Sequence, residues 1–307
     1  MNFKHLLVLL MGLVSITVTK AQAYRYPVIP DSIIEGNNRV LYLANHFWDN
    51  ADFEDDTLLT KPKVILDYLY VLYLLPEKEA SVNIRNSILL LSKYPKQFHL
   101  LLIWLERYLH NPQSPYFNDE LFSWTVDAIL QTDLDDESTD IWIRQSELLT
   151  KNRLGEKAED FSFIDKDGQT MQLYDIVAPY LMIIFNNPDC SHCKKTEELI
   201  SRNDTIQLLI NSDKLTVLAI CPDIEYDCWV KHQYPSNWIS GFDSNGTIIK
   251  EMLYEIQQYP SLYLLDGRKN VLLKEANYES VCKYINMALR NHLPTRLIQQ
   301  NIDNQQK

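Results

Sequence analysis

Two cysteines separated by two residues, Cys190 and Cys193, are the residues of this sequence whose types and spacing most directly suggest chemistry. They follow the apolar run 181–185 and open a segment with helical character, so Cys190 stands at the start of a helix. The helix dipole and the unpaired backbone N–H groups at that end favour a thiolate, the attacking species in disulfide exchange. Cys193 lies one turn along and can displace a bound partner. The pair therefore predicts a redox-active disulfide with Cys190 as the nucleophile and Cys193 as the resolving thiol.

The segments around this pair alternate between strand and helix patterns from residue 155 onward. Gly155 marks the end of the preceding helix, and Asp167-Gly168 is typical of a hairpin turn. The continuous apolar runs 181–185 and 215–220 predict strands buried on both faces. The strands expected by these patterns are 161–164, 171–173, 181–185, 215–220, 261–265 and 271–273, followed by a helix over 279–291. This half of the chain is therefore predicted to be an α/β domain.

The first half of the chain is predicted to be entirely helical over about 37–153. Pro62, Pro76 and Pro95 each stand where a new helical pattern begins, a position that tolerates the missing N–H. One stripe of apolar residues at helical spacing comprises Phe98, Leu101, Leu102, Leu105, Tyr108 and Leu109. The aromatic residues are expected in the core rather than in a binding groove. They are Tyr42, Phe47, Trp48, Tyr68, Tyr70, Tyr73, Trp104 and Tyr108.

The ends of the chain have patterns of their own. Lys4, the apolar stretch 6–14 and the sequence Ala21-Gln22-Ala23 are typical of a cleaved signal peptide over residues 1–23. The expected organisation is then a helical domain over 24–154, an α/β domain over 155–292 and a disordered polar tail over 293–307. The apolar stretch is far shorter than the roughly 20 residues that span a bilayer. The sequence predicts export to the periplasm, with no integral membrane segment after signal cleavage.

Net charge and cysteine count narrow the possible partners. The chain carries 29 basic and 41 acidic side chains, a formal charge of −12, which argues against a nucleic-acid partner. Five cysteines, all beyond residue 189, are too few to form a disulfide scaffold in a chain of 307 residues. Their odd number means that at least one stays unpaired or pairs only transiently.

The second half, residues 155–292, resembles the thioredoxin-like domains of secreted thiol-disulfide oxidoreductases, and among these the reductases of the TlpA and ResA type. The resemblance is carried by Gly155, the strand 181–185, the Cys190–Cys193 motif and Tyr259-Pro260 ahead of the strand 261–265. It implies a thioredoxin-like fold. It also implies that Pro260 is cis and faces the active disulfide, and that Tyr259 and Pro260 bind the substrate polypeptide.

His192 lies between the two cysteines, as a histidine does in strongly oxidising periplasmic disulfide donors. It is expected to tune Cys190 toward the thiolate, and the less favoured alternative is an exposed linker residue without this role. Three positions depart from the family pattern. Asp189 replaces an aromatic residue and opposes thiolate formation, Ile184 replaces a buried acid, and Thr196 replaces an acid after the motif. Glu197 and Glu198 are the next carboxylates available.

The first half resembles a helical domain of unknown function that precedes thioredoxin-like domains in exported bacterial proteins. Residues 45–48 and 111–116 carry this resemblance, which implies no chemistry of its own. His46 and His110 lie in these stretches. They are expected to be capping or core residues rather than ligands.

Other interpretations of the cysteines are weaker. Cys221 and Cys228 could complete a zinc site with the motif, but the six residues between them do not match a zinc knuckle. They could form a local disulfide or remain two packed thiols, and Cys282 is expected in the core. Copper delivery and peroxidase chemistry each lack part of their motif. No metal ligands and no cofactor are predicted.

The sequence therefore predicts an exported thiol-disulfide oxidoreductase that more often acts as a reductant. Its partners would be protein thiols and disulfides, together with a membrane or periplasmic electron donor. The alternative is a binding or interaction protein in which the thioredoxin-like domain is a redox-inert scaffold. An exchange-active pair equilibrates with glutathione, whereas a structural disulfide resists reduction.

Overall fold

The computed structural model describes residues 24–222 and 226–292. The predicted signal peptide, 1–23, and the predicted tail, 293–307, lie outside the described residues. The chain divides into two compact units between Trp104 and Leu105. The domain boundary expected at residue 154 lies further along the chain than this division, and it stays a prediction. Within the described residues, no helix is both long and apolar enough to cross a membrane.

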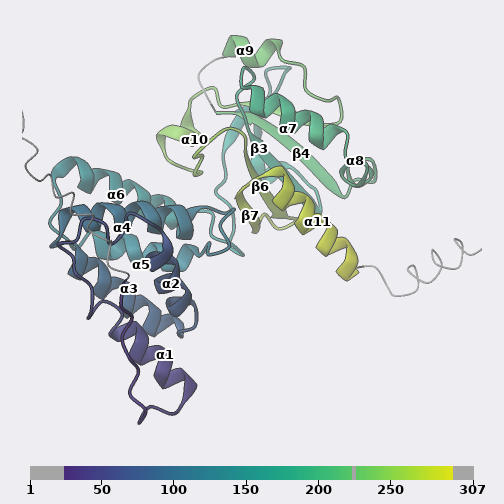
Figure 1. Cartoon of the computed structure of the whole chain (residues 1–307). Coiled ribbons are helices and arrows are strands. Elements are labelled where there is room, and N and C mark those ends of the chain that lie inside the picture. Colours follow the sequence, from purple (N-terminus) through teal and green to yellow (C-terminus); the bar gives the residue numbers. More distant parts are fainter. Residues whose placement is uncertain (1–23, 223–225, 293–307) are drawn as a thin grey trace, which may run out of the picture. The chain divides into compact units, whose positions relative to one another are not determined.

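The first unit is helical (Figure 1). Its helices are α1 (Gly36–Asn45), α2 (Lys63–Tyr73), α3 (Glu77–Leu91) and α4 (Pro95–Leu105), of which α4 ends at the unit boundary. Pro62 and Pro76 are the residues before α2 and α3, and Pro95 is the first residue of α4. The prolines therefore mark the helix starts as expected, because each has no N–H to leave unpaired.

The core of this unit is built around Tyr68, whose side chain is fully buried. Its hydroxyl shares a hydrogen bond of 2.6 Å with the Ser87 hydroxyl, which also accepts from the Trp48 indole N–H at 2.8 Å. Two of the aromatic residues expected in the core are instead on the surface, since Tyr70 is 59% and Tyr73 is 51% exposed. Tyr70 directly follows Leu69 and so projects from a different side of α2, and Tyr73 is the last residue of that helix.

The second unit begins with three further helical segments. The helix that contains α4 continues as a short π-helix, η1 (Glu106–His110), and is followed by α5 (Asp119–Ile129) and α6 (Asp136–Leu149). Side chains of Asn118 and Asp135 cap the two α-helices by accepting hydrogen bonds from backbone N–H groups in the first turn. In the predicted apolar stripe, Leu101, Leu105 and Leu109 are fully buried, as the spacing indicates.

A seven-stranded mixed sheet forms the centre of this unit (Figure 1). The strands are β1 (Ser162–Ile164), β2 (Thr170–Gln172), β3 (Tyr180–Phe185), β4 (Leu215–Cys221), β5 (Ile239–Phe242), β6 (Ser261–Asp266) and β7 (Val271–Ala276). Their order across the sheet is β2-β1-β5-β4-β3-β6-β7. Strands β3, β4 and β5 run parallel, and β6 pairs antiparallel with β3. The long apolar runs that predicted β3 and β4 occupy the middle of the sheet, where both faces are covered.

Alternate residues of the central strands build two separate cores. On one face, Met182 and Ile184 pack with residues of α7 (Ser191–Ser201), α8 (Asp204–Asn211) and α11 (Tyr278–His292). On the other face, Leu181, Ile183 and Phe185 pack with Phe161, Leu173 and Ile248, the last from α10 (Thr247–Lys250). Because side chains of a strand alternate between faces, one apolar run supplies both cores.

Several elements have no counterpart among the sequence-based expectations. These are β5, the short 3₁₀ segment η2 (Leu173–Asp175), and the helices α8, α9 (Tyr226–Lys231) and α10. β5 contains Ser240 and Gly241, so it has neither an alternating nor a continuous apolar pattern. It is held by pairing with β4 on one side and β1 on the other. The final helix starts one residue before and ends one residue after the expected span.

Candidate active site

The cysteine motif lies where the central strand β3 gives way to helix α7. Cys190 is the N-cap residue of α7, in an extended conformation, and its carbonyl accepts the hydrogen bond from the Lys194 N–H at 3.2 Å. A turn closed by the Cys190 N–H and the Asn187 carbonyl, at 3.0 Å, leads into it. The strand beneath is paired on both sides, so the motif is held by the most buried part of the sheet.

The two thiols have opposite electrostatic environments. Partial burial of Cys190 opposes ionisation, but hydrogen bonds from Cys193 and from the His192 backbone, together with the Lys194 charge, outweigh it and lower the pKa of this thiol. Cys193 is only 7% exposed, and its burial, together with the nearby Cys190 sulfur, raises its pKa from 9.0 to about 12. The geometry therefore gives one accessible thiol that ionises easily and one buried thiol that keeps its proton.

Tyr259 and Pro260 lie directly beside the nucleophile position. The peptide bond between them is cis, and the Cys190 sulfur lies 3.8 Å from the Tyr259 carbonyl oxygen. They meet although they are 69 residues apart, because Ser261 at the start of β6 pairs with Phe185 at the end of β3. The structure thus brings together four of the five predicted site residues, Cys190, Cys193, Tyr259 and Pro260.

The fifth, His192, lines a groove beside the motif. The groove has a volume of about 300 Å³, and its walls include Lys195, Tyr259, Pro260, Tyr278 and Glu279. His192 is exposed, and its backbone N–H is the part that favours the Cys190 thiolate. Tyr259, which lines this groove, also has its carbonyl oxygen 3.8 Å from the Cys190 sulfur.

Asp189, the residue before Cys190, has a hydrogen-bond partner that the sequence did not indicate. The Cys228 thiol, on α9, donates a hydrogen bond to the Asp189 carboxylate at 3.1 Å. The two residues are 39 positions apart, so no local spacing could reveal the contact. The acceptor of this hydrogen bond is therefore the carboxylate that lies next to Cys190.

Around the buried Cys193 thiol, Ile184 and Thr196 occupy the positions where the family pattern has acids. Other polar groups lie nearby. Ile184 and Thr196 are buried, and Glu197 pairs with His232 Nε2 at 2.9 Å. The Tyr234 hydroxyl donates to the Asn186 side-chain oxygen at 2.8 Å, and the pKa of Tyr234 is raised by burial and by the nearby Cys221 and Cys193 thiols. Tyr234 is therefore a titratable group close to the resolving thiol that the sequence did not single out.

The structure also shows the surroundings of Cys221 and Cys282, which lie outside the motif. Cys221 ends β4 and packs with Trp229 and Phe242 in a small buried cluster. Cys282 packs against the core on the α11 side, where the Asn203 amide lies 3.7 Å from its sulfur. Cys282, which was expected in the core, is therefore only partly buried at the edge of it.

Comparisons with known proteins place the chain in a family. The sequence profile of a domain of unknown function, DUF5106, matches residues 12–152. A thioredoxin-like protein from Bacteroides caccae is 33% identical with a TM-score of 0.72, and the match covers 86% of this chain and 98% of that chain. The C-terminal domain of an uncharacterized protein from Bacteroides fragilis is 37% identical with a TM-score of 0.43, covering 44% and 98%. The chain therefore belongs to the thioredoxin-like proteins, with the DUF5106 domain ahead of the thioredoxin-like fold.

The thioredoxin domain of a thiol-disulfide oxidoreductase from Bacteroides vulgatus is 21% identical with a TM-score of 0.37, covering 43% of this chain and 98% of that chain. No curated protein matches the chain. The predicted thioredoxin-like fold behind an all-helical domain of unknown function is confirmed.

Proposed function

We propose that this protein exchanges disulfides with protein clients through Cys190 and Cys193. The observation that carries the proposal is the contrast between the two thiols: Cys190 is half-buried with a lowered pKa, and Cys193 is buried with a raised one. A redox-inert scaffold has no need of this contrast, whereas an exchange site needs an ionised attacking thiol and a protected resolving thiol.

The proposed reaction has two displacements. The Cys190 thiolate attacks one sulfur of a client disulfide, the client S–S bond breaks, and the leaving sulfur takes up a proton. Cys193 then loses its proton and attacks the Cys190 sulfur, so that the mixed disulfide breaks and the second client thiol is released. Two electrons pass to the client, and Cys190 and Cys193 end as a disulfide. The Tyr259 carbonyl and Pro260 border the position at which the client backbone would lie.

The preferred direction in this proposal is reduction of the client. A thiolate that is strongly stabilised makes its disulfide a strong oxidant. The Asp189 charge next to Cys190 limits that stabilisation, which favours a reductant. A membrane or periplasmic electron donor would then return the pair to the dithiol form. The signal-peptide pattern at residues 1–23 supports an exported, periplasmic enzyme.

Trapping of the mixed disulfide tests the proposal. In the Cys193→Ser variant, Cys190 can still attack a client but nothing releases it, so covalent complexes should accumulate on non-reducing gels and disappear with reductant. The matched Cys190→Ser variant should trap no client. Equal trapping by both variants, or trapping by neither, contradicts the assigned roles.

A further inference from the structure

A group of side chains that could bind a metal ion lies in the same unit as the cysteine motif. His110 ends η1, Glu255 lies in the loop between α10 and β6, and Glu275 lies near the end of β7. One possible ligand atom from each residue lies within 4.8 Å of the others. His110 is only 4% and Glu255 only 7% exposed. Three potential metal ligands from distant parts of the chain thus converge below the surface.

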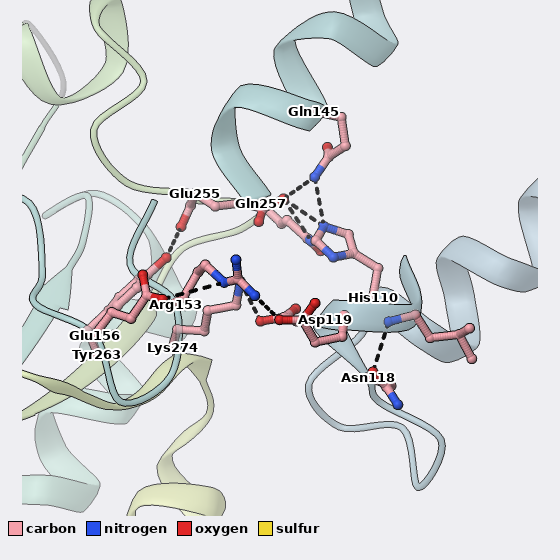
Figure 2. Close-up of polar contacts among 12 residues, drawn as sticks. His110, Asn118, Asp119, Gln145, Arg153, Glu156, Glu255, Gln257, Tyr263 and Lys274 are labelled. Atoms are coloured by element: carbon pink, nitrogen blue, oxygen red, sulfur yellow. Dashed lines mark hydrogen bonds and ion pairs between the residues drawn. The ribbon is translucent and has the colours of Figure 1, made fainter. Parts of the chain in front are cut away.

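The positions of His110 and Glu255 are fixed by several contacts (Figure 2). His110 Nε2 lies 2.6 Å from Glu255 Oε1, and the Gln145 amide donates to the same oxygen at 3.1 Å. The Tyr263 hydroxyl donates to the Glu255 backbone carbonyl at 2.8 Å. The ring of Phe122 stacks on His110 with centroids 4.3 Å apart. The contacts from Gln145, Tyr263 and Phe122 are of the second-layer kind that holds ligands in place around a metal.

The cluster nevertheless leaves buried polar atoms unsatisfied. Within the described residues, His110 Nδ1, Glu255 Oε2 and Glu275 Oε1 are buried without a hydrogen-bond partner. A buried polar atom without a partner destabilises the fold, and more so when the group is charged. Three such atoms in one cluster point to a ligand that would engage them.

The charges around the cluster are also unbalanced toward the negative side. The buried Lys274 ammonium pairs with the Asp119 carboxylate at 2.8 Å (Figure 2). The Lys274 charge also acts on Glu255 and Glu275, so one lysine and one histidine face three carboxylates. A bound divalent cation would balance the Glu255 and Glu275 carboxylates at once.

Local backbone geometry directs Glu275 to this place. Two residues of β7, Lys274 and Glu275, stand opposite the single residue Tyr263 of β6, because the register shifts between the pairs 262–276 and 264–273. Glu275 also has a φ of +46°, a backbone conformation that residues other than glycine seldom adopt. Bulges of this kind commonly re-aim a side chain next to a functional site.

We propose that His110, Glu255 and Glu275 bind one divalent transition-metal ion of the Zn²⁺ type. One imidazole nitrogen with two carboxylate oxygens suits Zn²⁺ better than Ca²⁺ or Mg²⁺, which bind through oxygen in larger ligand sets. A cavity of about 30 Å³ adjoins the cluster, lined by Glu275, Asn111 and Gln257, and it has room for a water molecule as a fourth ligand. Pro260, which borders the groove beside the cysteine motif, also lines this cavity, but the proposed disulfide exchange needs no metal ion.

Titration of the full-length protein with Co²⁺ tests the proposal, because Co²⁺ reports its own ligands by absorption. After treatment with EDTA, the protein should bind one equivalent of Co²⁺ with visible d–d bands and without the near-ultraviolet bands of thiolate ligation. Zn²⁺ should displace it. Glu275→Gln and His110→Gln should each weaken the affinity at least about tenfold. The matched control Glu251→Gln, an exposed carboxylate on the same unit, should leave the affinity unchanged.

A second measurement keeps the test valid if a variant folds poorly. Zn²⁺ should raise the melting temperature of the wild type and of Glu251→Gln, and EDTA should reverse the increase. Glu275→Asp keeps the charge one methylene further back, so it should bind Co²⁺ more weakly than the wild type and more tightly than Glu275→Gln. The proposal is overturned if no stoichiometric binding occurs, if all bound Co²⁺ has thiolate bands, or if folded Glu275→Gln binds as the wild type does.

Discussion

The Cys228 thiol donates a hydrogen bond of 3.1 Å to the Asp189 carboxylate, which directly precedes Cys190 in the chain. The negative charge that the sequence places beside the motif is therefore held by a neighbouring helix. Two opposite electrostatic influences therefore act on the Cys190 thiol. The backbone N–H groups at the helix start favour its thiolate. A negative charge next to a thiol is expected to oppose it.

Removing that charge should make Cys190 ionise more easily. In Asp189→Asn, the pH midpoint for alkylation of Cys190 should fall by roughly half a pH unit, since two unit charges about 4 Å apart interact by about 1 kcal/mol in water. The rate of iodoacetamide modification against pH, followed by mass spectrometry, measures this midpoint. Cys228→Ser retains a donor to Asp189, so its midpoint should stay close to that of the wild type. An unchanged or higher midpoint in Asp189→Asn would exclude this role.

The buried thiol should make the reduced protein less stable at alkaline pH. The pKa of Cys193 is raised from 9.0 to about 12 by burial, so between these values the unfolded chain releases a proton that the folded chain keeps. Ionisation therefore favours the unfolded state, and stability falls as pH rises through this range. Urea unfolding at several pH values should show a smaller loss for Cys193→Ser than for the wild type. Equal pH dependence of the two proteins would contradict the raised pKa.

The hydrogen bond between Tyr234 and Asn186 should stabilise the region under the motif. Tyr234→Phe removes the donor and leaves the buried Asn186 oxygen unsatisfied, which should cost about 1–2 kcal/mol of unfolding free energy. Tyr226→Phe, at an exposed tyrosine, is the matched control and should cost less than about 0.5 kcal/mol. Chemical denaturation measures both. Equal losses in the two variants would show that the buried hydrogen bond contributes little.

Strand β5 depends on the absence of a side chain at Gly241. A Cβ atom there would overlap the Phe163 ring and come within 2.6 Å of the Ile220 side chain. Gly241→Ala should therefore destabilise the protein by about 1–3 kcal/mol through overpacking. Gly36→Ala is the control, because nothing lies within 4 Å of the added atom at the start of α1. Thermal unfolding compares the two, and a stable Gly241→Ala variant would contradict this packing.

The parts of the fold that the sequence predicted are those with strong local patterns. Strands β3 and β4 are continuous apolar runs because they are central, and Pro62, Pro76 and Pro95 mark helix starts because proline lacks an N–H. Strand β5 was missed because pairing with β4 and β1, rather than its own residues, makes it extended. Tyr70 was misplaced because an aromatic residue at helical spacing does not reveal which face of α2 is buried.

The sequence indicated the position of the cysteine pair at the start of a helix, and it missed the long-range contacts around that pair. Cys190 and Cys193 are neighbours in sequence, so their spacing alone indicated their roles. The contact between Asp189 and Cys228 and the proximity of Tyr234 to Cys193 arise from packing between segments far apart in the chain. The pair His110 and Glu255 is 145 residues apart, which no motif could connect.

The most direct test of the proposed function is a redox titration of the Cys190–Cys193 pair against glutathione. The fraction of oxidised protein is measured by alkylation and mass spectrometry at each ratio of reduced to oxidised glutathione, with Cys193→Ser as the control that cannot form the internal disulfide. The account predicts a reversible two-electron transition at a potential above about −300 mV. A disulfide that resists reduction across the whole glutathione range, or a pair that never forms one, would contradict it.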